Sequence, residues 1–293
     1  MHNFIKFWGT RGSCSVSGHE YVHFGGNTPC LEINYHNSRV IIDAGTGIHM
    51  LGKQLLHETV DEIHLFIGHT HWDHLIGFPF FAPIYHSDAQ IHIWTPPSPG
   101  RPCKDLFDDL LSPEFFPVRL SQIQGQARID FHTAHPNMPV TFGDLKIEFH
   151  LACHPSTTYC FKITTPHQTI GYVTDNEMLQ HYHGPLDNVP PDILEPHVSL
   201  IQFLSDCDLL VHEAQYTPEE YVKRAGWGHS SYRNAVALLL QTKTPQWIVT
   251  HHDPDHSDKD LHKMHLATKE LLKETGSPCT VEWAHDGLVL KLK

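Results

Sequence analysis

Short stretches in which apolar residues alternate with polar ones, or follow one another without a break, recur along the first half of the chain. This pattern is typical of β-strands, because side chains of a strand point alternately to its two faces. It predicts strands at residues 4–8, 30–35, 40–42, 65–67 and 91–94. A glycine-rich break at residues 43–47 precedes an expected helix over 48–57. A proline-rich stretch opens an irregular segment that runs from 96 to about 125, with one short helix near 104–111.

Strands and helices alternate in the second half. The pattern predicts strands at 145–151, 159–164, 169–173, 208–211, 247–249, 280–283 and 288–292, and helices at 192–205, 218–224, 231–241 and 257–273. A strand-rich half followed by strand–helix alternation favours an α/β layered fold, with mixed sheets between helices. The chain shows no internal repeat and no low-complexity linker, so we expect a single domain over residues 1–293.

Composition narrows the class of protein. The 293 residues include 20 Lys and Arg against 33 Asp and Glu, for a formal net charge of −13, together with 28 histidines. An acidic chain without a basic run is a poor partner for extended nucleic acid. No apolar stretch reaches the length of a membrane span, and the start lacks the pattern of a signal peptide. The seven scattered cysteines form no C-x-x-C pair, so we expect reduced thiols and a cytoplasmic location.

The segment from residue 69 to 74 carries the strongest chemical signal. It reads His69-Thr70-His71-Trp72-Asp73-His74 and directly follows a predicted strand. Histidines two apart on extended chain project to one side and can share one metal, while Asp73 and His74 at the turn can address a second. In a histidine-rich chain an H-x-H pair arises by chance, but the four-residue pattern with an aspartate at a strand end is a specific indication of a metal site.

Three further candidate ligands follow other predicted strands. They are His154, Asp175 and His251. Each alone has an ordinary explanation, such as a capping histidine or a turn aspartate. Active-site residues of layered α/β proteins nevertheless collect at strand ends along one edge of a sheet, and these positions match that rule.

With these residues in order, the sequence resembles the metallo-β-lactamase-fold hydrolase superfamily over nearly its whole length. The resemblance implies an αββα sandwich of two mixed β-sheets flanked by helices, with a two-metal site in the groove between the sheets. It assigns one metal to His69, His71 and His154, the other to Asp73, His74 and His251, and makes Asp175 the bridge. Asp43, in Asp-x-Gly-x-Gly, would be a supporting residue. His252 adjoins His251 and is the alternative ligand. We expect two divalent ions, Zn²⁺ first and Mn²⁺ as the alternative.

Two later segments indicate which chemistry the site performs. Glu213 ends a predicted strand, and His229 opens a predicted helix. They resemble elements of the phosphodiesterase branch, which includes tRNA 3′-end-processing endonucleases and cyclic-nucleotide phosphodiesterases. A carboxylate beside a histidine favours the imidazolium, which can neutralise a phosphoryl group or protonate a leaving oxygen. The ordinary alternatives are a capping histidine and a surface carboxylate.

The mechanism that we predict is attack by a metal-bridging hydroxide in line on phosphorus. Asp73 and Asp175 keep the hydroxide in place, and His229, oriented by Glu213, assists at the phosphate or the leaving group. The catalytic residues that we predict are therefore Asp73, His229 and Glu213.

A small phosphodiester, such as a cyclic nucleotide, is the expected substrate. His154 and Asp175 are only 21 residues apart, which leaves no room for the RNA-gripping arm that the endonuclease family commonly carries there. We expect no membrane partner, and the resemblance allows a homodimer. Trp227 would stack a base or pack, and Arg11 would meet a phosphate or form a loop salt bridge. The alternatives are a tRNA 3′-processing endonuclease, an ester, lactone or lactam hydrolase using the same metals, or a metal-binding carrier.

Overall fold

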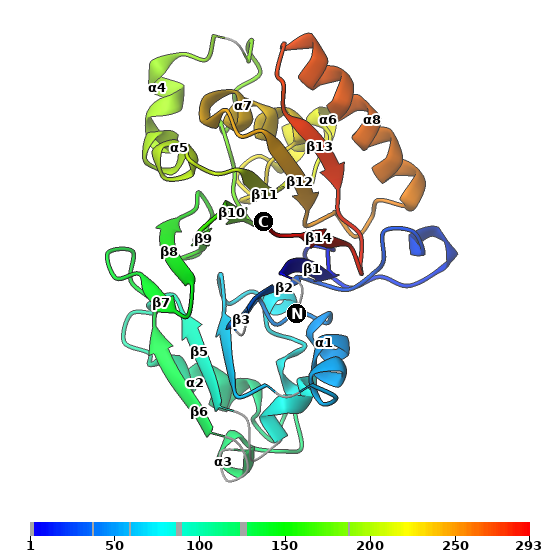
Figure 1. The fold of residues 1–293 in the computed structure, drawn as a ribbon. Coiled ribbons are helices and arrows are strands. Elements are labelled where there is room, and N and C mark those ends of the chain that lie inside the picture. Colours follow the sequence, from blue (N-terminus) through cyan, green and yellow to red (C-terminus); the bar gives the residue numbers. More distant parts are fainter. Residues whose placement is uncertain (1–2, 37, 59, 86–89, 124–127, 187) are drawn as a thin grey trace.

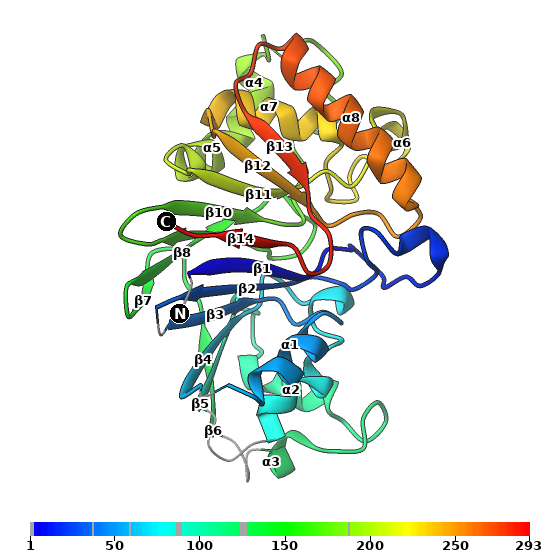
Figure 2. The ribbon, with the colours of Figure 1, turned by 45° about the vertical axis from the view of Figure 1, so that its right-hand side comes forward.

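Two sheets packed face to face, with helices on both outer faces, form the core of the protein (Figures 1 and 2). The structure is a computed structural model that describes residues 3–36, 38–58, 60–85, 90–123, 128–186 and 188–293. Both sheets are mixed, and within these residues each has seven strands. The predicted αββα sandwich is therefore confirmed.

The first sheet has the order β14-β1-β2-β3-β4-β5-β6. Its strands pair in antiparallel fashion from β14 to β3 and in parallel from β3 to β6. Their bounds are Phe4–Gly9 (β1), Cys30–Tyr35 (β2), Ser38–Ile42 (β3), Glu62–Phe66 (β4), Gln90–Thr95 (β5), Arg128–Thr133 (β6) and Val289–Lys291 (β14).

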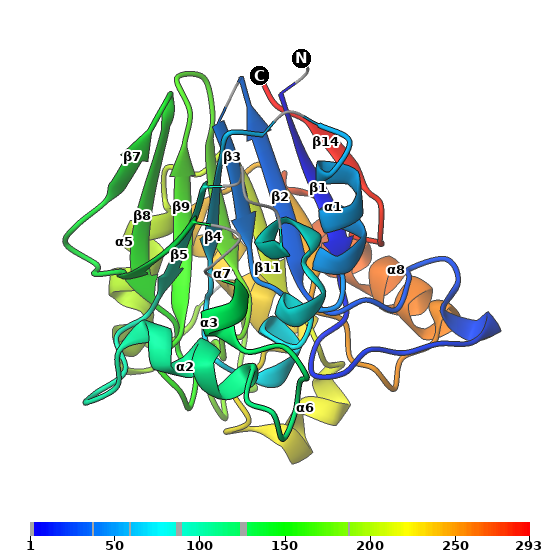
Figure 3. The ribbon, with the colours of Figure 1, turned by 90° about the horizontal axis from the view of Figure 1, so that it is seen from below.

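The second sheet has the order β13-β12-β11-β10-β9-β8-β7. Strands β7 to β10 are antiparallel neighbours, and β10 to β13 are parallel. Their bounds are Val140–Phe142 (β7), Leu145–Leu151 (β8), Tyr159–Thr164 (β9), Thr169–Val173 (β10), Leu209–Glu213 (β11), Gln246–Thr250 (β12) and Thr280–Trp283 (β13). The chain passes from one sheet to the other between β6 and β7, and it returns between β13 and β14. Seen from below, β7 and β8 lie at one side and β1 and β14 at the other (Figure 3).

The helices lie along the outer faces of the sheets. Their bounds are Ile48–Leu55 (α1), Cys103–Leu110 (α2), Leu120–Ile123 (α3), Pro191–Leu194 (α4), Val198–Leu204 (α5), Pro218–Arg224 (α6), Tyr232–Thr242 (α7) and Asp258–Glu274 (α8). Three of them begin at side-chain caps, where Thr217, Ser231 and Ser257 accept hydrogen bonds from backbone N–H groups of the first turn. Within the described chain, no helix is long and apolar enough to cross a membrane.

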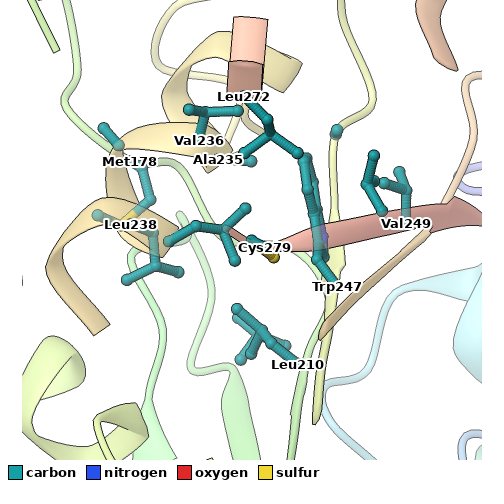
Figure 4. Packing of buried hydrophobic residues seen from close by; sticks show 14 of the residues in the cluster. Met178, Leu210, Ala235, Val236, Leu238, Trp247, Val249, Leu272 and Cys279 are labelled. Atoms are coloured by element: carbon teal, nitrogen blue, oxygen red, sulfur yellow. The ribbon is translucent and has the colours of Figure 1, made fainter. Parts of the chain in front are cut away.

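Three apolar layers hold the sandwich together. One lies between the two sheets, where Phe66 of β4 meets Phe149 and Phe161 of the second sheet. Another packs the first sheet against α1 and α2. The third packs the second sheet against α5, α7 and α8 around the fully buried Trp247 (Figure 4). Burial on both faces explains why the central strands are apolar without a break, as the sequence pattern indicated.

Two regions differ from the prediction. The helix expected over 192–205 is divided into α4, a 3₁₀ turn at Glu195–His197 and α5. Pro196 lies in that turn, and it has no N–H to continue a helix. Strands β6 and β7 were not predicted. The irregular segment expected up to about residue 125 also contains α3, and residues 124 and 125 lie outside the described residues.

Candidate metal centre

The H-x-H-x-D-H segment lies in the loop that leaves β4, as predicted. The loop includes a 3₁₀ turn at Trp72–His74, which brings Asp73 and His74 back toward His69. The His69 and His74 ring centroids are 4.2 Å apart, and both side chains are fully buried. One short segment therefore supplies several donor side chains at a single point, immediately beyond a buried strand.

One group of donor atoms comes from His69, His71, His154 and Asp175, and these atoms lie within 4.8 Å of one another. His71 Nδ1 is 3.4 Å from His154 Nε2, and His69 Nε2 is 3.6 Å from Asp175 Oδ1. His154 follows β8 and Asp175 follows β10, so the fold brings three separate segments together here. This is the set expected for the first metal, with the bridging aspartate.

A second group comes from Asp73, His74 and His251, also within 4.8 Å. Asp73 Oδ2 is 3.3 Å from His74 Nε2 and 3.2 Å from His251 Nε2. Asp175 Oδ2 lies 3.2 Å from His74 Nε2 and 3.4 Å from His251 Nε2, so Asp175 faces both groups. The structure thus brings all seven predicted ligands together.

The donor set fits two cations. Both ring nitrogens of His69 are buried and have no hydrogen-bond partner among the described residues, and His74 Nε2 lies against carboxylate oxygens of Asp73 and Asp175. Within the same part of the chain, no Lys or Arg side chain pairs with Asp73 or Asp175, although both are buried. Buried carboxylates and imidazoles without partners are costly unless a cation satisfies them. Imidazole and carboxylate donors suit zinc and manganese.

The pKa values show the same concentration of charge. Burial alone would lower the pKa of His74, but Asp73, Asp43 and Asp175 raise it well above its usual value. Burial would raise the pKa of Asp175, but the surrounding histidines lower it well below its usual range. The carboxylates that draw a proton onto His74 also attract a metal ion, which would have to displace that proton.

Left-handed backbone marks three residues of the centre. Asp43, Asp175 and His251 have φ values of 66°, 51° and 60°, and each follows a strand closely. Such conformations cost free energy for residues other than glycine, and they cluster at functional sites. Asp43 accepts a hydrogen bond from the Gly68 N–H (2.8 Å), and its Oδ2 lies 2.9 Å from His74 Nδ1. It thus orients His74 from outside the centre, the supporting role that the resemblance implies.

Two glycines make room for the ligands. A Cβ added to Gly12 would lie 2.3 Å from the His251 ring, and one added to Gly228 would lie 2.3 Å from His154 Nδ1. Gly228 also has a φ of +92°, and its carbonyl oxygen lies 2.9 Å from that same His154 nitrogen. The backbone therefore approaches each histidine more closely than any side chain would allow.

His229 and Glu213 form a pair beside the metal ligands. His229 Nδ1 lies 3.1 Å from Glu213 Oε1 and 3.9 Å from Asp175 Oδ1, and its ring stacks on His251 at 5.2 Å. Burial would lower the pKa of His229, but the Glu213 carboxylate raises it to about 9. His229 lies two residues before Ser231, the N-cap of α7. The Glu213 carboxylate, rather than the end of the helix, therefore stabilises the positive charge of its imidazolium. The two residues that sequence reasoning selected are therefore in contact.

Sequence reasoning missed the residues that support the second ligand group. The Ser13 N–H donates to Asp73 Oδ2 (2.8 Å), and Gln215 links the Ser13 hydroxyl to His251 Nδ1 (3.3 Å each). Gln215 lies two residues after Glu213, in a segment already noted. Gly12 and Ser13 also lie in a glycine-containing segment near the start of the chain. Neither segment's sequence indicates which metal ligand its residues contact.

Neighbouring candidates have other roles. His252 Nε2 lies 2.7 Å from the Ala284 carbonyl oxygen, and its ring stacks on Trp283, so His251 and not His252 reaches the centre. Arg11 is fully buried and donates to backbone carbonyls, with a 4.0 Å ion pair to Asp258, which excludes the predicted phosphate contact and leaves the loop salt bridge. Trp227 is 62% exposed and is therefore not part of the apolar core.

A cavity of about 460 Å³ opens beside His154. Glu177, Gln180, Asp192 and His197 contribute polar walls, and Gly226, next to Trp227, closes one side. Its size suits a small molecule held next to the metal ligands.

Comparison with known proteins agrees with this geometry. The family model described as "Beta-lactamase superfamily domain" matches residues 38–252, which is most of the chain. A ribonuclease Z from Staphylococcus haemolyticus is 22% identical over 299 residues, covering 83% of this chain and 89% of that protein.

Solved structures share the fold. The metallo-β-lactamase fold protein YhfI from Bacillus subtilis superposes with a TM-score of 0.70 and 18% identity, over 100% of both chains. Unliganded yeast PDE1 superposes with a TM-score of 0.67 and 16% identity, also over 100% of both chains. The fold prediction is confirmed by these likenesses.

Proposed function

Because this chain belongs to the beta-lactamase superfamily, we propose that it is a metal-dependent phosphodiester hydrolase acting on a small, cyclic nucleotide-like substrate. The observation that carries the proposal is the Glu213–His229 pair placed against the metal ligands. A phosphodiester presents both a charged phosphoryl group and an alkoxide leaving group to a buried imidazolium, whereas a neutral ester or lactone presents only the leaving group.

The distances between donor atoms divide the seven candidate ligands into two groups that share Asp175. His69, His71 and His154 would hold one ion, Asp73, His74 and His251 the other, and Asp175 both. When bound, the two ions, Zn²⁺ or Mn²⁺, would supply Lewis-acid activation of water and neutralise phosphoryl oxygens. Asp73 and Asp175 carry the negative charge that retains them, and the Ser13 N–H and Gln215 hold Asp73 and His251 in orientation.

His229 supplies the proton. Its Nδ1 faces Glu213, so its Nε2 is the atom free to meet the substrate. Glu213 is itself fixed by three backbone N–H groups, those of Asn176, Gln215 and Ser230. The imidazolium would therefore stay in place to neutralise a phosphoryl oxygen, or to protonate the departing alkoxide.

Three features support a small substrate. Between His154 and Asp175 the chain forms only the short hairpin of β9 and β10. The net charge of −13 opposes the docking of a large polyanion. The cavity beside His154 matches a nucleotide-sized molecule, and the exposed Trp227, which follows Gly226 of its lining in the chain, is a candidate surface for base stacking.

The second candidate is a tRNA 3′-processing endonuclease, which the ribonuclease Z relative favours. One experiment separates the candidates: the zinc-loaded protein is assayed in parallel on a 3′,5′-cyclic nucleotide, bis(p-nitrophenyl) phosphate, a precursor tRNA and a lactone. We expect turnover of the first two. Faster turnover of precursor tRNA would favour the endonuclease, and lactone turnover without phosphodiester turnover would refute both. Loss of phosphodiester turnover in His229→Ala, with the metal content unchanged, would tie the activity to this site.

A further inference from the structure

A second cluster of histidines lies on the first sheet, away from the candidate metal centre. It contains Glu62 and His64 of β4 and His92 of β5, whose donor atoms lie within 4.8 Å of one another. We propose that Glu62, His64 and His92 form a third metal site, which takes a divalent transition metal such as Zn²⁺. The site goes beyond the proposed hydrolase function, because none of its residues belongs to that centre.

The strand register builds the cluster. Strands β4 and β5 are parallel neighbours, and His64 pairs directly with His92. Glu62 precedes His64 by two residues, so its side chain points to the same face of the sheet. Glu62 Oε1 lies 3.2 Å from His64 Nε2 and 3.0 Å from His92 Nε2. Tetrahedral zinc with bonds of about 2.0–2.1 Å separates its donor atoms by roughly 3.3 Å, close to these distances.

His64 is held in place, and the polar group that faces it is a carboxylate. It is 6% exposed, its Nδ1 has no hydrogen-bond partner among the described residues, and its Nε2 lies 3.2 Å from Glu62 Oε1. Its ring stacks on Phe142 of β7 at 3.9 Å, and on His92 at 4.9 Å. Phe142 thus fixes the ring and leaves its nitrogen directed toward Glu62. A buried imidazole whose nitrogen faces a carboxylate beside a second imidazole forms a donor set that a bound cation would satisfy.

Burial also keeps His64 in the form that binds metals. Removal from water lowers its pKa to about 4, even though Glu62 acts in the opposite direction. The ring is therefore neutral near pH 7, and no proton has to be displaced from it before a metal binds.

His92 has the supporting contacts that metal-binding histidines commonly show. Its Nδ1 lies 3.1 Å from His132 Nε2 and 3.8 Å from Asp130 Oδ2, both on β6. Such contacts fix the ring and leave Nε2 for the metal. The Glu62 side chain is 53% exposed, so an ion can enter from solvent. In Figure 1, β5 and β6 lie near β7, the strand whose Phe142 stacks on His64.

The two sites are far enough apart to be tested separately. His64 precedes His69 by five residues, which is about 16 Å along extended chain. Between them in the chain is Phe66, which packs on Phe149 and Phe161 of the second sheet. A substitution at Glu62 or His92 should therefore leave the hydrolase centre intact.

The test is metal stoichiometry at equilibrium. Purified protein is stripped with a chelator, dialysed against buffered free Zn²⁺, and its zinc and protein contents are measured by mass spectrometry and amino-acid analysis. The variants are His92→Gln and Glu62→Gln, which keep side-chain size and leave the packed His64 in place. His57→Gln is the matched control, because His57 is an exposed histidine outside both clusters.

We expect three zinc ions per chain for the unaltered protein and for His57→Gln, and two for His92→Gln, with phosphodiesterase activity unchanged in all. Glu62→Gln should bind the third ion more weakly, and it keeps the proposal testable if His92→Gln does not fold. Two ions in the unaltered protein would overturn the proposal. So would three ions that persist in both variants, since that result would place the extra ion on other surface histidines. Failure of the phosphodiesterase assay with a normal third equivalent would refute only the hydrolase proposal.

Discussion

The Glu213→Gln substitution tests the chemistry of the candidate centre most directly. Glu213 is fully buried and accepts four hydrogen bonds. Oε1 accepts from Asn176 N and His229 Nδ1, and Oε2 accepts from Gln215 N and Ser230 N. Glutamine has the same size, but its NH₂ group must face one of these pairs. At least one backbone N–H then loses its acceptor, at a cost of about 1–3 kcal/mol in the free energy of unfolding.

The larger effect falls on the proton of His229. Burial opposes its charge, and Glu213 raises its pKa to about 9. Relative to the ordinary value of about 6.5, the difference corresponds to about 3 kcal/mol of stabilisation of the imidazolium. At pH ~7.5 a ring with a pKa of about 9 is mostly protonated, and removing the carboxylate that raises this pKa most should lower the protonated fraction, although Asp175 and Asp73 still raise it. A tenfold or greater loss of rate should follow wherever the proton is needed.

The assay is kcat as a function of pH for a cyclic nucleotide and for bis(p-nitrophenyl) phosphate. A general acid must be protonated, so activity should be lost as pH rises through about 9 in the unaltered enzyme, and at lower pH in Glu213→Gln. The loss should be greater for the cyclic nucleotide, because its alkoxide leaving group needs a proton and p-nitrophenolate does not. Equal losses would instead indicate that His229 neutralises the phosphoryl group.

Glu177→Gln is the matched control. Glu177 is also a buried carboxylate that accepts from backbone N–H groups, those of Gly226 and Gly228, but it does not contact His229. It should lower stability without moving the alkaline limb of the pH profile. If that limb stays in place in Glu213→Gln as well, the assignment of the proton donor is wrong.

Three further predictions address the rest of the structure. Gly228→Ala should displace His154 and reduce the zinc content measured by mass spectrometry. Gly276→Ala is the control, because Gly276 also has a positive φ (+66°) but open space around it. It should lower the free energy of unfolding in denaturant by only about 1 kcal/mol and leave the zinc content unchanged. Burial lowers the pKa of His252 to about 3, so its contribution to the free energy of unfolding is complete above about pH 6.5 and is lost as pH falls toward 3; His252→Phe should flatten that slope in unfolding titrations. Chelation should abolish activity and lower Tm, because Asp175 loses its compensating cations; an unchanged Tm would contradict that account.

Most of the fold could be predicted from apolar patterning. The central strands are buried on both faces and stand out as apolar runs, and α6, α7 and α8 begin at recognisable caps. Strand β6 was not predicted, although Ile129 and Phe131 alternate with polar residues. It is the edge strand of the first sheet, and its exposed polar residues resemble those of a surface loop. The proline at position 196 indicated a break in the helix, but the apolar periodicity on both sides of it led to the prediction of one continuous helix.

The ligands of the candidate centre could be found because each is a strong metal donor directly after a strand. The residues that hold them in place carry no such signature. The contact between Gly12 and His251 joins two segments at opposite ends of the chain, and that between Ser13 and Asp73 joins residues 60 positions apart. A backbone N–H donates to a carboxylate whatever its side chain, so only the tertiary structure reveals this support.

The high histidine content also limits what the sequence alone can predict about metal sites. Twenty-eight histidines offer many chance motifs, and the sequence singles out those in the H-x-H-x-D-H segment because they are close in the chain. His64 and His92 are separated by a long connection, and only the parallel register of β4 and β5 sets them opposite each other. A metal site built across strands is invisible to motif searches, because its spacing is set by the loop length and not by the chemistry. The same chain can therefore contain one metal centre that a sequence motif predicts and another that becomes apparent only from the pairing of strands in the sheet.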